Sequence, residues 1–388
     1  MPTFACNDDL RVAAKRRVPK MFYDYVDSGS WTESTYRANA SDLAAIRLRQ
    51  RVAVDVCERN SQCQLLGQAV RMPVGMAPTG LTGMVWPNGE VLAMRACEDF
   101  GVPYCLSTVS IGSIEHVARH ATVPFWFQLY VIRDRDFIER LLTRAEAAGV
   151  ETIVLTLDLQ MVGQRNRDIH NGLSSPPKPT LRNLANLALK PAWCLAMARH
   201  RQMQFGNLQG HVSGVGGHMS LAQWTDSQFD PTLNWDDVRR FRDRWKGKLV
   251  LKGILDPDDA DSAVACGADA IVVSNHGGRQ LDGAPSTIEA LPRIAQRVAG
   301  RTEILVDGGF TSGQDVVRAR ALGADGVLMG RALLYGLGAA GQAGVTRALE
   351  MIRNEMETTM GLCGLSTPAE IGPDNLWQNT SADLNMQE

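Results

Sequence analysis

The stretch KLVLKGI (248–254) is the first of four short apolar runs that end in polar residues or glycine, and it is followed by AIVVSNH (270–276), EILVDGG (303–309) and GVLMGRA (326–332). Apolar runs of this length are typical of strands buried on both faces of a parallel sheet. Their starts lie roughly 20 to 35 residues apart, which is the length that a strand, a loop and a returning helix require. The second half of the chain therefore predicts four consecutive βα units.

The first half of the chain contains four similar runs, namely MPVGMAP (72–78), VPYCLST (102–108), FWFQLYV (125–131) and TIVLTLD (152–158). Eight such units predict an α/β fold of the (β/α)8, or TIM-barrel, type. We expect one domain over residues 1–388, with the barrel at about 70–340, a helical segment before it (1–69) and a second helical segment after it (341–388).

One connection is much longer than the others. About 90 residues separate Asp158 from Lys248, far more than one crossover needs. The excess predicts a long insertion at about 165–235 on the fourth βα loop, at the active-site end of the barrel. Because this segment is rich in Pro and Gly, we expect it to be mobile, with one or two short helices inside it.

The part of the insertion with helical character is LRNLANLALKPAWCLAMARHRQMQF (181–205), which is amphipathic. It can be interpreted as a helix packed on the barrel mouth or on another subunit. Alternatively, it forms a basic, Trp-bearing surface that lies on an anionic membrane. The residues behind the second interpretation are Arg182, Lys190, Trp193, Arg199 and Arg201.

Composition limits the partners. The 388 residues are 45% hydrophobic and 21% charged, and the formal net charge of −2 gives no reason to expect nucleic acid as a partner. The eight cysteines show no CxxC or metal-like Cys/His spacing, so we expect no metal site and a reduced, cytoplasmic compartment. We expect no secretory signal and no spanning helix. Peripheral contact with the inner face of the cell membrane is compatible with this pattern.

Polar residues and glycines gather where the predicted strands end. Singly, each has a structural explanation, such as a helix cap or a snorkelling lysine. In a barrel, however, the carboxyl ends of all strands face the active site, and six or more such residues on one rim favour a catalytic site. They are Pro78, Thr79, Gly80, Ser107, Gln128, Tyr130, Thr156, Asp158, Lys252, Ser274, Asn275, His276, Asp307, Gly308, Gly309, Gly330 and Arg331.

The motif SNHGGRQLDG (274–283) carries the strongest catalytic signal. His276 ends a strand and Arg279 follows after two glycines that permit a tight turn. A histidine is suited to accept a proton at neutral pH, and an arginine fork matches a carboxylate. Asp158, at the end of another strand, is placed to orient the imidazole. The alternative is a histidine that only satisfies hydrogen bonds in the core.

Two glycine-rich strand ends, DGG (307–309) and MGR (329–331), close the last two units of the barrel. Exposed backbone N–H groups beside Arg331 would form a phosphate site, and phosphate-bearing cofactors commonly bind at this place in the fold. We therefore expect a phosphate-bearing ligand.

These motifs resemble those of the FMN-dependent L-2-hydroxy acid dehydrogenases and oxidases over nearly the whole chain. The resemblance extends from PKMFYDYVDSG (19–29) to GRALLYGLG (330–338), and SNHGGRQLDG is highly specific to the family. WTESTYRANASD (31–42) and LRQRVAVDV (48–56) are most similar to the bacterial L-lactate dehydrogenase branch, whereas MAPTGLTGMVWPNGE (76–90) is also similar to mandelate dehydrogenase.

The resemblance implies roles for individual residues. His276 would be the catalytic base, with Asp158 as its partner. Lys252 would lie near the N1 and O2 edge of the flavin, where a positive charge favours the reduced anion. The substrate would be bound by Tyr25, Tyr130, Arg165 and Arg279. FMN would be held by Pro78, Thr79, Gly80, Ser107, Gln128, Thr156, Lys252, Ser274, Asp307, Gly308, Gly309, Gly330 and Arg331.

Two residues depart from the family pattern. Thr311 stands where members usually have an arginine, two residues past DGG, so one of two expected phosphate-binding arginines is missing. This predicts weaker FMN binding or a substitute group elsewhere. Gly80 stands where many oxidases have alanine, which favours a dehydrogenase that uses oxygen poorly.

The resemblance implies an FMN-dependent oxidation of an L-2-hydroxy acid, foremost L-lactate to pyruvate, with electrons passed to a quinone or a cytochrome-type acceptor. The alternatives are an oxidase that uses oxygen and releases hydrogen peroxide, a mandelate-type dehydrogenase, or an FMN-binding barrel without redox turnover. Relatives are commonly tetramers, so a homo-oligomer is expected.

Overall fold

The computed structural model describes residues 3–173, 180–200, 205–208 and 228–377. Its centre is a sheet of eight parallel strands in the order β3-β10-β9-β8-β7-β6-β5-β4, and a parallel bridge between Met76 and Tyr104 joins the two edges. The predicted (β/α)8 barrel is confirmed. The strands are β3 (Val74–Met76), β4 (Cys105–Ser107), β5 (Trp126–Tyr130), β6 (Thr152–Thr156), β7 (Lys248–Ile254), β8 (Ala270–Val273), β9 (Glu303–Asp307) and β10 (Gly326–Met329).

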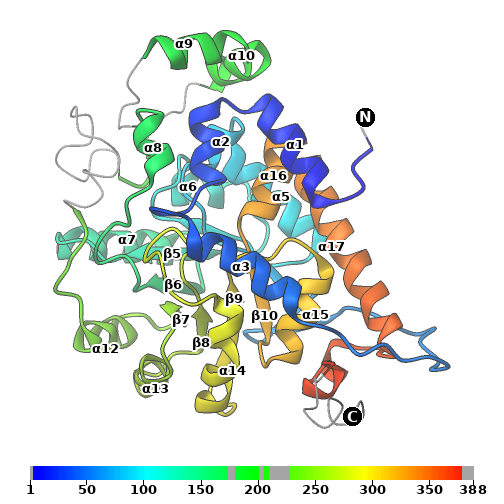
Figure 1. Ribbon diagram of the computed structural model, residues 1–388. Helices are drawn as coiled ribbons and strands as arrows, with labels where there is room; N and C mark the ends of the chain where they lie inside the picture. Colours follow the sequence, from blue (N-terminus) through cyan, green and yellow to red (C-terminus); the bar gives the residue numbers. More distant parts are fainter. Residues whose placement is uncertain (1–2, 174–179, 201–204, 209–227, 378–388) are drawn as a thin grey trace.

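Helices surround the barrel in Figure 1 and cover the outer face of the sheet. Most of them begin after a polar side chain that accepts a hydrogen bond from a backbone N–H of the first turn, as at Asp134, Ser286 and Ser312. The helices are α5 (Gly89–Phe100), α6 (Ile114–Ala118), α7 (Arg135–Ala147), α12 (Trp235–Arg244), α13 (Pro257–Ala265), α14 (Thr287–Val298), α15 (Gly313–Ala321) and α16 (Arg331–Ala340).

The barrel interior is filled with apolar side chains from alternate strand positions, among them Trp126, Val154 and Leu305. A hairpin of β1 (Cys63–Leu65) and β2 (Gln68–Val70) adds Leu65, Leu66 and Val70 to this cluster. The interior is therefore a packed core, which leaves the carboxyl ends of the strands as the place for a site.

The segment before the barrel is helical only up to Ala45, in contrast to the prediction for residues 1–69. It consists of α1 (Asn7–Arg17), α2 (Lys20–Val26), α3 (Ser34–Ala45) and then the β1–β2 hairpin. β1 and β2 each contain a glutamine and only one buried residue, so neither forms the continuous apolar run that predicts a barrel strand. After the barrel, α17 (Gln342–Leu362) packs against α16 and is followed by two short 3-10 turns, η1 (Pro368–Glu370) and η2 (Pro373–Asn375).

The described part of the insertion contains α8 (Asn166–His170), α9 (Leu181–Ala188) and α10 (Pro191–His200), one helix more than predicted, with a break before Pro191. Trp193 is buried, stacks on Phe22 at 5.5 Å and donates a hydrogen bond to the carbonyl of Met84 at 3.0 Å. The prediction that Trp193 faces a membrane is therefore wrong. Arg201 and the Gly-rich run of the insertion lie outside the described residues. The predicted mobility of the insertion concerns these residues and stays a prediction.

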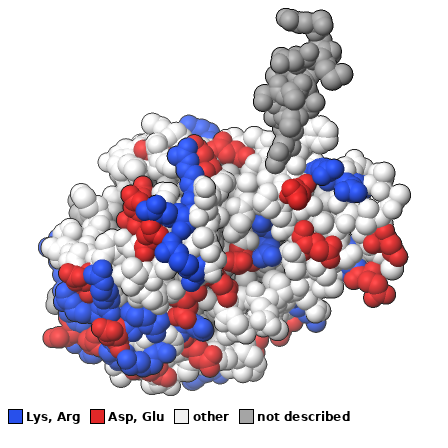
Figure 2. Space-filling model, turned by 90° about the horizontal axis from the view of Figure 1, so that it is seen from below, with Lys and Arg blue, Asp and Glu red and all other residues white. Residues whose placement is uncertain are grey.

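Figure 2 shows Lys and Arg side chains beside Asp and Glu side chains on the face seen from below. Ion pairs join neighbouring helices around the barrel, such as Arg244 of α12 with Glu146 of α7 and Arg297 of α14 with Asp261 of α13. Charges on this face are largely balanced between neighbouring helices.

Candidate active site

A cavity of about 760 Å³ lies at the carboxyl ends of the barrel strands. It is lined by most of the residues that the sequence predicted for the site. These are Tyr25, Pro78, Thr79, Gly80, Tyr130, Arg165, Lys252, His276, Arg279, Asp307, Gly308, Gly309, Gly330 and Arg331. Side chains that lie up to 306 positions apart in the chain therefore border one space.

His276 faces this cavity from the loop after β8. Its Nδ1 lies 3.0 Å from Oδ1 of Asp158, and its Nε2 lies 3.4 Å from the hydroxyl of Tyr130. The backbone of His276 has φ of 58°, which is unfavourable for a residue with a Cβ, and His276 lines the cavity in this conformation. The hydroxyl of Ser274 accepts a hydrogen bond from the His276 N–H at 3.0 Å and helps to hold this turn.

Asp158 is a fixed negative charge behind the imidazole. Burial opposes its ionisation, but the charge and hydrogen bond of His276 and the charge of Lys252 together lower its pKa. Asp158 is thus ionised at neutral pH and positioned to hold a proton on Nδ1, which leaves Nε2 free to accept one.

Lys252 lies at the centre of the barrel mouth and is buried. Its Nζ is 2.7 Å from Oδ2 of Asp307 and donates a hydrogen bond to the hydroxyl of Ser274 at 2.7 Å. Burial disfavours the charged ammonium, yet the charges of Asp307 and Asp158 raise its pKa overall. Lys252 therefore places a permanent positive charge in a low-dielectric site.

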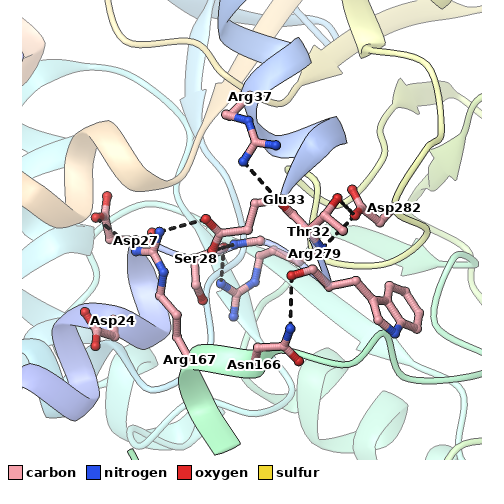
Figure 3. A network of polar contacts seen from close by, with 12 residues as sticks. Asp24, Asp27, Ser28, Thr32, Glu33, Arg37, Asn166, Arg167, Arg279 and Asp282 are labelled. Atoms are coloured by element: carbon pink, nitrogen blue, oxygen red, sulfur yellow. Dashed lines mark hydrogen bonds and ion pairs between the residues drawn. The ribbon is translucent and has the colours of Figure 1, made fainter. Parts of the chain in front are cut away.

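Two arginines that line the cavity lie close to the ring of Tyr25. The guanidinium of Arg279 lies 4.7 Å from the centre of the Tyr25 ring, and that of Arg165 lies 5.5 Å from it. Arg279 Nη1 donates to the carbonyls of Tyr25 and Ser28, as Figure 3 shows for Ser28. Burial and the charge of Arg165 lower the pKa of Arg279 to about 10, so it stays cationic at neutral pH.

Arg165 is held by a buried carboxylate. Its Nε lies 3.1 Å from Oδ2 of Asp168, whose other oxygen is buried without a partner among the described residues. Asp168 thus fixes the side chain of Arg165, as the Tyr25 and Ser28 carbonyls fix that of Arg279. Each guanidinium keeps further N–H donors for a ligand.

Ser107, Gln128 and Thr156 do not line the cavity. They form a buried row in which Ser107 donates to Gln128 Oε1 at 3.1 Å and Gln128 Nε2 donates to Thr156 at 3.0 Å. Ser274 and Asp158 likewise lie behind lining residues. Their contacts position the residues in front of them, whereas direct contact with a flavin stays a prediction.

The two glycine turns border the part of the cavity where a phosphate is predicted, which is named the phosphate end. Gly308 and Gly309 have φ of 98° and 87°, and a Cβ on Gly309 would lie 2.6 Å from the carbonyl oxygen of Asn39, so only glycine fits. α16 begins at Arg331, directly after Gly330, so unbonded N–H groups of its first turn are available near this end.

Several lining residues were not predicted from the sequence. Phe205 and Phe229 come from the insertion, and Arg11, Tyr36 and Arg37 come from α1 and α3. Arg37, Ala40 and Ser41 have the spacing of one helix face, and this pattern could have indicated the face of α3 that lines the cavity. The packing of these segments onto the barrel is long-range, so nothing local in the sequence indicates it.

The sequence of residues 14–378 matches the FMN-dependent dehydrogenase family. The chain belongs to this family. The L-lactate dehydrogenase of Caulobacter vibrioides (strain NA1000 / CB15N) is 48% identical and covers 94% of this chain and 95% of its own. That of Stenotrophomonas maltophilia (strain R551-3) is 47% identical, with coverages of 96% and 98%.

Solved structures of similar enzymes superpose on nearly the whole chain. A monotopic membrane (S)-mandelate dehydrogenase superposes with a TM-score of 0.90 at 37% identity, over 97% of this chain and 100% of that chain. A mandelate oxidase superposes with a TM-score of 0.82 at 36% identity, over 95% and 96%. The resemblance inferred from the motifs is confirmed, and FMN is the cofactor of this enzyme family.

The cavity residues fit FMN. Asp307 lines the cavity, and its Oδ1 is buried without a partner among the described residues, which suits an acceptor for a ribityl hydroxyl. The glycine turns and the start of α16 suit a phosphate, and the charge of Lys252 suits the electron-rich edge of a flavin.

Proposed function

We propose that this enzyme oxidises a small L-2-hydroxy acid, foremost L-lactate, to the 2-keto acid. The observation that supports this most strongly is the contact of His276 with Asp158 and Tyr130 in the cavity that Arg279 borders. A proton acceptor and a carboxylate-binding cation in one cavity are what a hydroxy acid requires. The curated L-lactate dehydrogenases, at 45 to 48% identity, support lactate as the substrate.

In the proposed mechanism Arg279, Arg165 and Tyr25 bind the substrate carboxylate, and Tyr130 hydrogen-bonds to the 2-hydroxyl oxygen. His276 Nε2 accepts the proton that leaves the substrate, and the charge of Asp158 stabilises the imidazolium that forms. FMN, when bound, would supply the acceptor for the two electrons that leave the substrate. Lys252 stabilises negative charge at the barrel mouth.

Apolar side chains that line the cavity limit the size of the substrate side chain. Val109, Leu159, Val162, Phe205 and Phe229 border the cavity, and the ring of Phe229 lies 5.2 Å from that of Tyr130. Two valines leave room for a methyl group or a longer aliphatic chain, and two phenylalanines offer an aromatic surface. (S)-Mandelate is therefore the second candidate substrate, favoured by these rings and by the structural similarity to a mandelate dehydrogenase.

The test is anaerobic flavin reduction with L-lactate, L-2-hydroxybutyrate, L-2-hydroxyisocaproate and (S)-mandelate, with D-lactate as the control. We expect the flavin absorbance near 450 nm, an approximate value for oxidised FMN, to bleach rapidly with L-lactate and far more slowly with D-lactate. Absence of bleaching by every L-2-hydroxy acid would refute the proposed function and favour an FMN-binding barrel without redox turnover.

We also propose a membrane quinone or a cytochrome as the electron acceptor, with the enzyme bound peripherally on the inner face of the membrane. Four exposed leucines of α9, α10 and the junction between them, named the α9–α10 leucines, support this: Leu181, Leu184, Leu189 and Leu195 are 87, 50, 77 and 56% exposed. Arg182, Lys190 and Arg199 lie among them. No helix in the described residues is long and apolar enough to span a membrane.

The rival acceptor is oxygen. Peroxide formation and dye reduction are to be measured with the same substrate. We expect dye reduction to be much faster, because the proposed acceptor is a quinone or a cytochrome, and faster peroxide release would establish an oxidase instead.

A further inference from the structure

The cavity continues beyond the barrel mouth to a space between α1, α3 and the two glycine turns. On α3, Arg37, Ala40 and Ser41 are one turn apart, and all three line this space. On α1, Asn7 and Arg11 have the same spacing and also line it, and Asn7 donates a hydrogen bond to the carbonyl of Thr311 at 3.3 Å. The segment before the barrel thus completes the phosphate end.

Arg331 is the cation of this end that belongs to the barrel, but most of its donors are already used. Its Nε donates to the carbonyl of Val26 at 3.0 Å, and its Nη2 donates to Ser28 at 2.9 Å and to Gly277 at 2.8 Å. Arg331 therefore keeps few donors for a phosphate. The adjoining loop contributes Thr311, which has no charge. A phosphate dianion here requires a further cation.

Two other arginines border this end, and their partners differ. Arg11 donates to both oxygens of Asp27 at 3.1 and 3.2 Å and lies 3.7 Å from Asp8, which also lines the space, so its charge is compensated. Arg37 donates to the backbone carbonyl of Thr32 at 2.9 Å, and the described residues include no carboxylate partner for it.

Figure 3 shows this difference from close by. Arg167 lies between Asp27 and Glu33 and pairs with both, whereas the Arg37 guanidinium lies on the other side of the Thr32–Glu33 turn. Arg37 is the cation at this end that is ready to bind an anion.

We infer that Arg37 is the second phosphate-binding cation for FMN and takes the place of an arginine at position 311. This inference rests on FMN as the cofactor and does not depend on which substrate is oxidised. Because Arg37 acts on the phosphate alone, its loss should weaken FMN and leave riboflavin, which has no phosphate, unaffected.

The test measures FMN and riboflavin binding to the full-length apoprotein by quenching of flavin fluorescence. Arg37→Ala should weaken FMN binding by about 10- to 100-fold, as expected for charge-assisted hydrogen bonds, with riboflavin unchanged. Arg47→Ala is the matched control, because Arg47 is exposed just after α3 and does not line the cavity. It should change neither affinity.

The double variant Arg37→Ala/Thr311→Arg should recover most of the FMN affinity, because position 311 lines the same space. Equal FMN affinity in Arg37→Ala and the wild type would overturn the inference. An equal loss of FMN and riboflavin affinity would also overturn it, because Arg37 would then only support the Thr32 turn. Neither result would bear on substrate oxidation, which is measured separately.

Discussion

At the scale of single residues, the imidazole of His276 contacts both Asp158 and Tyr130. His276 and Asp158 are 118 positions apart and lie 3.0 Å from each other, as strand ends of one barrel should. The left-handed backbone of His276 and the row that Gln128 forms behind the cavity could not be predicted, because both depend on the packing of neighbouring strands.

Asp158→Asn should slow anaerobic flavin reduction by about 10²- to 10⁴-fold, because the imidazolium loses its negative partner and an amide can impose the wrong tautomer on His276. The lowered pKa of Asp158 means that the wild-type carboxylate keeps its charge at any pH above its ordinary range. Stopped-flow absorbance measures the rate, and the flavin spectrum controls for bound FMN. A rate within a factor of about two of wild type would show that Asp158 is only structural.

At the scale of elements, the eight strands were predictable because each is a short apolar run between polar ends. The β1–β2 hairpin was not, because its strands, CQL and QAV, each contain a glutamine and lack the continuous apolar run of the barrel strands. Gly67 in the turn was the remaining signal. The insertion was predicted from its length, but the burial of Trp193 depends on Phe22 and Met84, which are remote in sequence.

Asn207 fixes the return of the insertion to the barrel. Its buried amide donates to Ser110 at 3.1 Å and accepts from the Ile114 N–H at 2.8 Å, next to cavity-lining Phe205. Asn207→Ala should lower the free energy of unfolding by about 1 to 3 kcal/mol, because buried polar groups lose their partners. Urea denaturation measures the change.

The matched control is Asn60→Ala, since Asn60 is exposed and its side chain accepts one local hydrogen bond. This substitution should stay within about 0.5 kcal/mol of wild type. Equal effects of the two substitutions would contradict the anchoring role of Asn207.

At the scale of the whole molecule, the cavity is completed by parts outside the barrel. The barrel supplies His276 and Lys252, the segment before it supplies Tyr25 and Arg37, and the insertion supplies Phe205. Figure 1 shows α9 and α10 at one end of the molecule, away from the helices around the lower barrel. The α9–α10 leucines are therefore placed for contact with a surface.

Leu181→Asp/Leu189→Asp should reduce cosedimentation with phosphatidylglycerol vesicles by at least about tenfold. The variant has two fewer leucines to insert into the lipid, and the anionic lipid headgroups repel its two added negative charges. Leu362→Asp is the control, since Leu362 is 58% exposed on α17, remote from α9 in the sequence. Soluble-dye reduction should be unchanged in both. Undiminished vesicle binding by the double variant would rule out this membrane surface.

The central claim is that His276 takes the substrate proton while FMN is reduced. The most direct measurement is anaerobic flavin reduction by L-lactate in His276→Gln, with bound FMN determined from the visible spectrum. We predict a rate lower by at least about 10²-fold with FMN still bound. Rapid reduction at the wild-type rate, with FMN bound, would contradict the account.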